Sequence, residues 1–211
     1  MTNLPKIISQ LVKVARLSYK RGLICGTEGN FSIKVNANLI LTTPKGICKG
    51  FLKPSDLVLV DLQGNRVKGL NKNNYRPSSE MDMHLCVYET RADANAVLHA
   101  HPTTLVAFTV SGLTLDYKIL PEIITTFKTI PVAQYATPGT SEVRQSIQEI
   151  IKTNDLVVLD HHGIIMLGDN ILDLFYKLEM LEHYAKTLLI AKILGEPQNL
   201  SNSAIEKLIM S

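Results

Sequence analysis

Several short apolar runs in this chain are joined by turns that are too short to contain a helix. Residues 31–35 and 39–43 are separated only by the turn residues 36–38, and residues 155–160 and 163–168 only by a pair of histidines. Runs of this length and composition are typical of strands, and strands joined so closely pair as antiparallel hairpins. The fold is therefore expected to contain antiparallel pairs.

Helical patterns separate other strand-like runs, and a helix between two strands allows a crossover connection. Residues 78–90 precede the run 96–101, and a helical segment that starts near Ser141 precedes residues 155–160. Hairpins beside crossovers predict an α/β fold with a mixed sheet, as a single domain over residues 1–211. Further helices are expected at 4–22, from Pro102 onwards and at 171–194, and further strands at 57–62 and 130–136.

The composition is that of an ordinary soluble domain. Apolar residues make up 45% of the 211 residues, the formal net charge is +3, and the Lys and Arg residues are scattered. A nucleic-acid partner is therefore not expected, and no apolar stretch reaches the roughly 20 residues that span a membrane. The three cysteines, Cys25, Cys48 and Cys86, form no CxxC pair, so we expect no disulfide framework and a cytoplasmic location.

The sharpest local feature is the pair His99 and His101 at the end of a strand-like run. Side chains at i and i+2 of a strand leave the same face, so the two imidazoles can converge on one metal ion. Two histidines can also fall near a strand end by chance. His161 or His162, at the end of another strand, could supply a third ligand. Successive strand residues face opposite ways, so only one of them can join, and the residues alone leave open which.

Glu80 follows Ser78 and Ser79 at an expected helix start, with one serine as the cap and Glu80 in the first turn. Its carboxylate can stabilise the helix start, or it can act as a general acid and base beside a metal. The serine hydroxyls and exposed N–H groups suit an anion such as phosphate. The small-residue turn at 26–30 offers a second such place. His84, on the same helix, lacks metal-ligand spacing and is expected to be structural or exposed.

Six short motifs follow one another along the chain in a characteristic order. They are GTEGNFS (26–32), TTPKG (42–46), PSSE (77–80), HAH (99–101), YATPGT (135–140) and DHHGI (160–164). In their order and spacing they resemble the class II aldolase family, and within it most of all the L-fuculose-1-phosphate aldolases. The likeness covers about residues 5–195, and the combination of PSSE, HAH and HHG is specific.

This resemblance implies a three-layer α/β/α domain around a mostly antiparallel sheet, assembled as a homotetramer with active sites between subunits. It implies one Zn²⁺ per subunit, or another divalent metal, bound by His99, His101 and His162. The third ligand is then the histidine immediately before the glycine of HHG. Glu80 is implied as the catalytic residue, which approaches the ion in an empty site and acts as acid and base when substrate is bound.

The resemblance also implies a phosphate pocket and a reaction. The pocket residues are Thr27, Gly29, Asn30, Gly46, Ser78 and Ser79, with Lys45 as an added charge where fuculose aldolases carry a small hydroxyl residue. The reaction is the reversible cleavage of a ketose 1-phosphate, similar to fuculose 1-phosphate, into dihydroxyacetone phosphate and an aldehyde. Zinc would stabilise the enediolate as a Lewis acid, and Glu80 would move the proton beside the carbonyl.

Two positions depart from the family. Its catalytic tyrosine after the HxH motif aligns near Leu120, and the C-terminal segment 201–211 lacks the tyrosine that completes a neighbouring site. Tyr117 or Glu122 could replace the first. These departures leave the aldehyde half of the substrate open.

Other functions share parts of this pattern. A sugar-phosphate 4-epimerase of the ribulose-5-phosphate type has the HxH metal site but usually carries Asp where this chain has Glu80. A methylthioribulose-phosphate dehydratase is another enzyme of the same superfamily. A non-catalytic interaction domain like the head of adducin keeps the fold while losing metal ligands, and the intact histidines argue against it.

Overall fold

The computed structural model of the chain describes residues 4–68 and 74–210, which form one sheet with helices packed on it. The strands are β1 (Asn30–Asn36), β2 (Leu39–Thr42), β3 (Val58–Val60), β4 (Ala96–Ala100), β5 (Val132–Ala133), β6 (Leu156–Leu159) and β7 (Gly163–Gly168). They lie in the order β3-β2-β1-β4-β7-β6-β5. All neighbouring pairs are antiparallel except β5 and β6, which are parallel. The expected mixed, mostly antiparallel sheet and both expected hairpins are confirmed.

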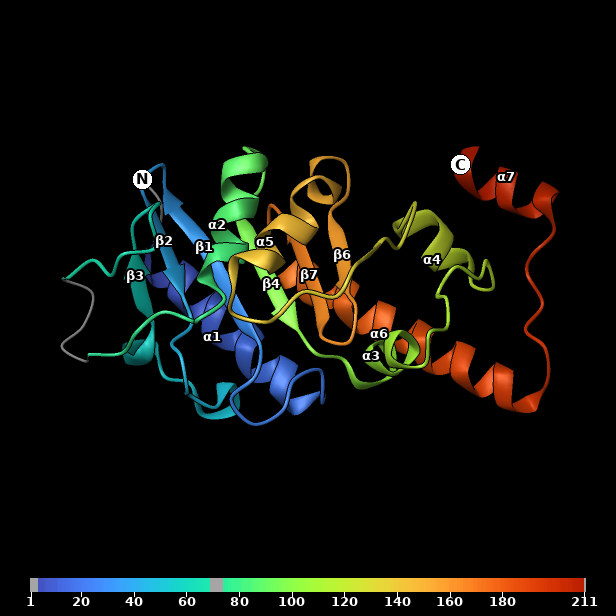
Figure 1. Cartoon of the computed structure of the whole chain (residues 1–211), viewed down its shortest axis with the longest axis horizontal. Coiled ribbons are helices and arrows are strands. Elements are labelled where there is room, and N and C mark those ends of the chain that lie inside the picture. Colours follow the sequence, from blue (N-terminus) through green and yellow to red (C-terminus); the bar gives the residue numbers. More distant parts are fainter. Residues whose placement is uncertain (1–3, 69–73, 211) are drawn as a thin grey trace.

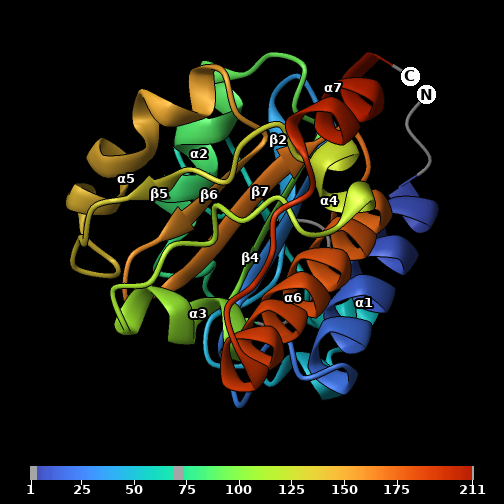
Figure 2. The same cartoon turned by 90° about the vertical axis from the view of Figure 1, so that its right-hand side faces the viewer.

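Helices cover both faces of this sheet. They are α1 (Leu4–Lys20), α2 (Met81–Thr90), α3 (Thr103–Val110), α4 (Pro121–Thr126), α5 (Ser141–Gln148), α6 (Ile171–Leu194) and α7 (Asn202–Met210). Short 3-10 turns lie at Lys49–Phe51, Pro54–Asp56 and Ile150–Lys152. Figure 2 shows the sheet between α1 and α6 on one side and α2 and α5 on the other. The expected three-layer α/β/α arrangement is confirmed.

Strand alternation explains why the molecule has two separate cores. In β4, Ala96, Leu98 and Ala100 belong to the apolar core beneath α1 and α6, whereas Val97 belongs to the core beneath α2 and α5. His99 shares the second face, because it lies two residues from Val97. The polar side chain of His99 thus lies on the face of the sheet that α2 covers.

Some elements differ from the sequence-based expectation. The helices α4 and α7 were not predicted, and the strands expected at 130–136 and 57–62 are shorter, at Val132–Ala133 and Val58–Val60. The helix α4 has only six residues, which is too short for a helical period to be recognised, and α7 has no buried side chain. Figure 1 shows α7 at one end of the molecule, after an extended segment that follows α6. Among the described residues, no helix is long and apolar enough to cross a membrane.

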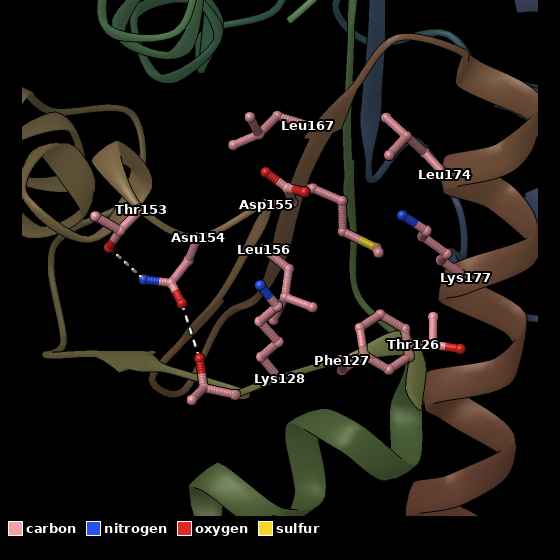
Figure 3. Close-up of a pocket in the computed structure, with 12 residues that line it drawn as sticks. Thr126, Phe127, Lys128, Thr153, Asn154, Asp155, Leu156, Leu167, Leu174 and Lys177 are labelled. Atoms are coloured by element: carbon pink, nitrogen blue, oxygen red, sulfur yellow. Dashed lines mark hydrogen bonds between the residues drawn. The ribbon is translucent and has the colours of Figure 1, made fainter. Parts of the chain in front are cut away.

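A small hollow of about 180 Å³ lies near the β5–β6 edge of the sheet (Figure 3). We call it the edge hollow. It is lined by residues of the loop after α4, of the start of β6, of β7 and of α6: Thr126, Phe127, Lys128, Thr129, Thr153, Asn154, Asp155, Leu156, Met166, Leu167, Leu174 and Lys177. None of the residues predicted to form a site lies in it.

Candidate metal centre

Four elements begin or end at one place in the sheet. Asn30 is the first residue of β1, His101 follows the end of β4, His162 precedes β7 and Glu80 precedes α2. Because β1 runs antiparallel to β4, Asn30 lies directly opposite His99 in the register. Side chains that are distant in the sequence therefore meet at this end of the central strands.

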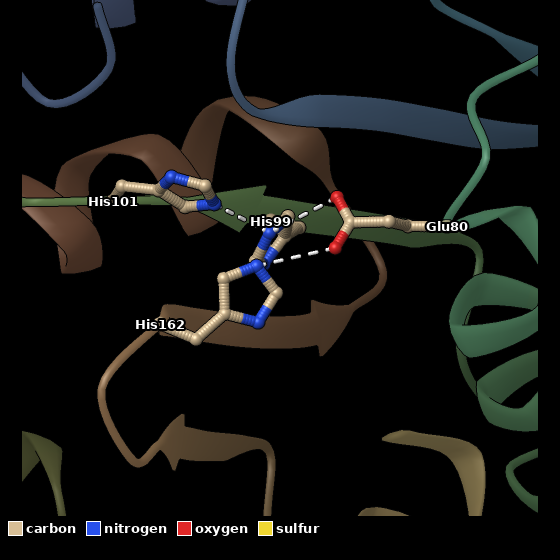
Figure 4. Close-up of side chains that lie close together, drawn as sticks. All are labelled: Glu80, His99, His101 and His162. Atoms are coloured by element: carbon tan, nitrogen blue, oxygen red, sulfur yellow. Dashed lines mark hydrogen bonds and ion pairs between the residues drawn. The ribbon is translucent and has the colours of Figure 1, made fainter. Parts of the chain in front are cut away.

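The side chains of Glu80, His99, His101 and His162 converge there (Figure 4). Nε2 of His101 lies 2.8 Å from Nε2 of His99. Nε2 of His162 lies 3.2 Å from Oε1 of Glu80, and Nε2 of His99 lies 3.4 Å from Oε2 of Glu80. One potential ligand atom from each residue can be chosen so that all four lie within 4.8 Å of one another.

The outer nitrogens of two of these rings have partners that fix the orientation of the ring. Nδ1 of His99 donates to the carbonyl oxygen of Ile164 at 2.9 Å. Nδ1 of His101 lies 3.4 Å from Oε2 of Glu28. An N–H on Nδ1 leaves the lone pair on Nε2, the nitrogen that faces the cluster, and this is the usual second shell of a metal-binding histidine.

The β6–β7 hairpin determines which histidine faces the cluster. His161 has a positive φ of 56°, a conformation that is uncommon for a residue other than glycine. Its ring is exposed, pairs with Asp160 at 2.9 Å and packs against Tyr135. The ring of His162 instead lies 4.9 Å, between centroids, from each of His99 and His101. The hairpin thus turns His162 inward and His161 outward.

Glycines allow the backbone to approach closely around the cluster. A Cβ on Gly163 would lie 2.4 Å from the carbonyl oxygen of Ala100 and 2.7 Å from the His101 ring. Gly29 has a φ of +69°, and a Cβ there would meet the Ile24 side chain at 2.6 Å. Both positions require glycine, for space or for conformation.

A chain of buried hydrogen bonds extends from Glu80 into the core. Nδ2 of Asn30 donates to Oε2 of Glu80 at 2.9 Å, and Oδ1 of Asn30 accepts from Nε2 of His84. Nδ1 of His84 then accepts from Oγ of Ser32 at 2.7 Å, and Tyr88 hydroxyl donates to the same Oγ at 2.8 Å. We call Asn30, His84, Ser32 and Tyr88 the relay. His84 is structural, as expected, and it orients the amide that holds Glu80.

The expected start of this helix was wrong. The helix α2 begins at Met81, and Glu80 is its N-cap residue without a capping side-chain bond. Oγ of Ser78 accepts from the Glu80 N–H at 3.2 Å, just before the helix. The Glu80 backbone is not helical, and its carboxylate contacts Asn30, His99 and His162, so it makes no capping bond to its own helix.

Burial sets the charge state of these groups. It lowers the pKa of His99 well below its usual value and, together with the charge of His162, lowers the pKa of His101. Burial alone would raise the pKa of Glu80, but its contact with His162 and its attraction to His99 outweigh this and lower the pKa. A neutral His99 and His101 beside an ionised Glu80 are protonation states that bind a metal.

This donor set fits a divalent cation. Oε1 of Glu80 is buried and has no hydrogen-bond partner among the residues that the structure describes, which is costly for a carboxylate oxygen. Three imidazole nitrogens that lie close together without donors between them are suited to a metal. Ligand atoms at about 2.0–2.1 Å from one tetrahedral ion lie about 3.4 Å apart, close to the separations observed here.

A cavity of about 430 Å³ opens beside the cluster, and we call it the main cavity. Its lining includes every residue predicted for phosphate binding, together with Glu80 and two of the histidines: Thr27, Gly29, Asn30, Lys45, Gly46, Ser78, Ser79, Glu80, His101 and His162. Four lining residues were not predicted: Glu28, Lys49, Pro138 and Gly139. Glu28 lies within the GTEGN motif and Gly139 within YATPGT, so the motifs could have indicated them.

Neither proposed replacement for the family tyrosine is among the described residues that line this cavity. The hydroxyl of Tyr117 accepts from Nζ of Lys192 at 2.8 Å, on the α6 side of the sheet. Glu122 is exposed on α4.

Comparison with known proteins agrees with this geometry. Residues 9–189 match the family model of the class II aldolase and adducin N-terminal domain. An L-fuculose phosphate aldolase of Methanococcus maripaludis is 36% identical, over 85% of this chain and 94% of the relative. A 5-deoxy-D-ribulose 1-phosphate aldolase of Bacillus thuringiensis serovar kurstaki is 31% identical, over 97% of this chain and 94% of the relative. A solved structure of an L-fuculose 1-phosphate aldolase superimposes with a TM-score of 0.84 at 33% identity, covering 97% of this chain and 95% of that one. The chain belongs to the class II aldolase and adducin N-terminal domain family.

Proposed function

We propose that this protein is a metal-dependent aldolase that reversibly cleaves a ketose 1-phosphate, similar to fuculose 1-phosphate, into dihydroxyacetone phosphate and an aldehyde. The protein is a lyase. The observation that carries the proposal is the convergence of three imidazoles and Glu80 beside a cavity that is lined by Glu80 and two of these histidines, together with two glycine turns and two serines. The names of the related aldolases support a ketose 1-phosphate as the substrate class.

His99, His101 and His162 would hold the divalent ion, one per chain, and we propose that it is Zn²⁺. Three imidazoles match the ligand preference of zinc and would leave a further coordination position for substrate. The bound ion supplies Lewis-acid chemistry, which polarises substrate oxygens and stabilises the negative charge that develops on them.

Glu80 is the proposed catalytic acid and base. Its lowered pKa keeps the carboxylate ionised near neutral pH, so in the condensation direction it can accept a proton from the carbon next to the carbonyl of dihydroxyacetone phosphate. In the cleavage direction it returns this proton to the same carbon after the C–C bond has broken. Asn30 donates to one oxygen of this carboxylate, and the other oxygen has no hydrogen-bond donor among the described residues. Asn30 therefore fixes the orientation of Glu80 and leaves one oxygen for the reaction.

The phosphate pocket is proposed in the same main cavity. The loops at Gly29 and Gly46 both have positive φ, and such turns can present backbone N–H groups to an anion. Ser78 and Ser79 add hydroxyls, and Thr27, Asn30 and Lys45 complete the lining. Several neutral donors around one cavity suit a phosphate group.

We also propose a homotetramer with active sites between subunits, acting in the cytoplasm, with residues 1–211 as a single domain. The tetramer rests on the resemblance to class II aldolases. Exposed apolar side chains at the ends of α6 and α7 support an interface: Ile193 is 75% exposed, Leu194 83% and Met210 88%. Sedimentation equilibrium should give four times the chain mass of 23.4 kDa, and a monomer at micromolar concentration would contradict this assembly.

A substrate panel tests the proposed reaction. Metal-loaded protein is incubated with several ketose 1-phosphates and, separately, with ribulose 5-phosphate. Released dihydroxyacetone phosphate is measured in a coupled assay that follows its enzymatic reduction. We expect release from at least one ketose 1-phosphate, loss of activity with a chelator, and recovery with Zn²⁺. Epimerisation of ribulose 5-phosphate without any release of dihydroxyacetone phosphate would assign the protein to the epimerases. Full activity in metal-free protein would contradict the metal-dependent mechanism.

A further inference from the structure

Lys49 is a buried lysine in the wall of the main cavity. It begins the 3-10 turn Lys49–Phe51, three residues after Gly46, and only 2% of it is exposed. Its Nζ donates to the carbonyl oxygen of Thr27 at 2.6 Å. This contact ties the turn around residue 49 to the GTEGN loop, whose residues also line the cavity.

Among the described residues, 4–68 and 74–210, no carboxylate lies close enough to Lys49 to form an ion pair with it. Burial lowers the pKa of Lys49 to about 8, although Cys48 and Glu80 oppose this shift. A buried ammonium group that lacks a counter-charge is costly, and proteins keep such groups chiefly where they act on a ligand.

Lys45 provides an informative contrast. It lines the same cavity but is exposed, so water screens its charge. A buried charge interacts more strongly with an anion because the surrounding dielectric is low. The lysine that the motif comparison indicated is therefore the weaker candidate for anion binding, and the one that the structure buries is the stronger.

We propose that the ammonium group of Lys49 binds the phosphate of the substrate and supplies the main positive charge of the phosphate pocket. This inference rests on the proposed function, because it assigns the anion in the main cavity to a sugar phosphate. One Lys49 N–H bonds to Thr27 and two remain for phosphate oxygens. The turn amides and the serine hydroxyls supply neutral donors, and Lys49 supplies the charge that they lack.

The test uses Lys49→Gln, with Lys49→Met as a second variant, and compares them with Lys45→Met in the same cavity, all in metal-loaded full-length protein. Gln keeps an N–H donor but removes the charge. Binding of inorganic phosphate and of dihydroxyacetone phosphate is measured by calorimetry. We expect both Lys49 variants to bind these ligands about 10–100-fold more weakly, the loss typical of a hydrogen bond to a charged group. Lys45→Met should weaken binding less than either Lys49 variant, because water screens the exposed Lys45 charge.

A purely structural role for Lys49 predicts a different result. In that case the variants melt at a lower temperature and bind phosphate with unchanged affinity. The proposal instead predicts an equal or higher melting temperature without phosphate, since an uncompensated buried charge has been removed, and a smaller stabilisation by added phosphate. Unchanged phosphate affinity in the folded variants, or a larger loss in Lys45→Met, would overturn the proposal.

The two proposals can fail separately. If the protein cleaves no ketose phosphate, but phosphate still binds and still depends on Lys49, the proposed reaction is wrong and the anion site remains. If cleavage is observed and both Lys49 variants bind phosphate like the wild type, the reaction remains and the role of Lys49 is wrong.

Discussion

The main cavity and the edge hollow are both lined by polar residues, but they differ in how far these residues bond to one another. In the edge hollow, the side chain of Asn154 accepts from Thr129 at 2.8 Å and donates to Thr153 at 3.1 Å (Figure 3). Asp155 pairs with Arg91 at 2.8 Å. In the main cavity, the buried Oε1 of Glu80 makes no hydrogen bond of normal geometry among the described residues and faces Nε2 of His162 at 3.2 Å, and Lys49 forms no ion pair with a described carboxylate.

This difference indicates where a ligand belongs. Polar groups that bond to each other in the free protein gain little from a ligand, whereas buried charges without partners can gain much from one. The main cavity offers a cation site at the three histidines and an anion site near Lys49. The edge hollow offers neither, although lysines also line it.

The largest expected effect follows from removing a metal ligand. His99→Ala should lower turnover at least about 10³-fold, because the Lewis acid is lost. Asn154→Ala, the matched change in the edge hollow, should leave turnover within about twofold of the wild type. Steady-state kinetics on both purified variants measures the contrast. Comparable losses in the two would remove the functional distinction between the two regions.

Glu80→Gln should have the next largest effect. The amide occupies nearly the same space but cannot accept a proton, so turnover should fall by about 10²-fold or more. Metal content, measured by atomic emission, should be largely retained because the three imidazoles remain. Turnover equal to that of the wild type would reassign the general base to another residue.

A smaller effect is expected from the relay. His84→Gln should slow turnover about tenfold, the usual cost of losing a partner outside the metal ligands, because Asn30 would no longer be held against Glu80. The loss should appear in kcat more than in KM. A change confined to thermal stability, with unchanged kcat, would show that His84 serves packing alone.

His84 should also contribute to the acid sensitivity of the fold. Burial lowers the pKa of His84 to about 4, whereas an unfolded histidine has a pKa of about 6.5. Between these pH values the unfolded chain binds the additional proton, so the free energy of unfolding falls as the pH drops from about 6.5 to about 4, by up to about 3 kcal/mol. Urea denaturation of wild type and His84→Gln across this range should show a shallower pH dependence in the variant, and parallel profiles would contradict this account.

Local patterns in the sequence were sufficient to predict most of the fold. The hairpins and crossovers indicated a mixed sheet, and the i, i+2 spacing placed His99 and His101 on one side of a strand. The spacing of Glu80, His84 and Tyr88, each four residues apart, could also have indicated the polar stripe from which the relay is built. Local periodicity carries this information because it reflects which face of an element is buried.

Other features depend on contacts between distant segments and could not be obtained in this way. The choice between His161 and His162 depends on the conformation of the turn between β6 and β7, where His161 has a positive φ, and the residues alone left it open. The burial of Lys49 depends on the GTEGN loop, where the bonded residue Thr27 lies 22 residues earlier in the sequence. Glu80 was expected within a helix because the serines before it resemble an N-cap. The attraction between its carboxylate and the histidines could not be seen in the local sequence.

The most direct test of the central claim is calorimetric titration of metal-free protein with Zn²⁺, comparing wild type, His162→Ala and His161→Ala. The two histidines are neighbours in the sequence, but only His162 joins the cluster. We predict one tightly bound ion per chain in the wild type and in His161→Ala, and loss of this binding in His162→Ala. Full binding in His162→Ala, or loss of binding in His161→Ala alone, would contradict the claim that His99, His101 and His162 hold the metal.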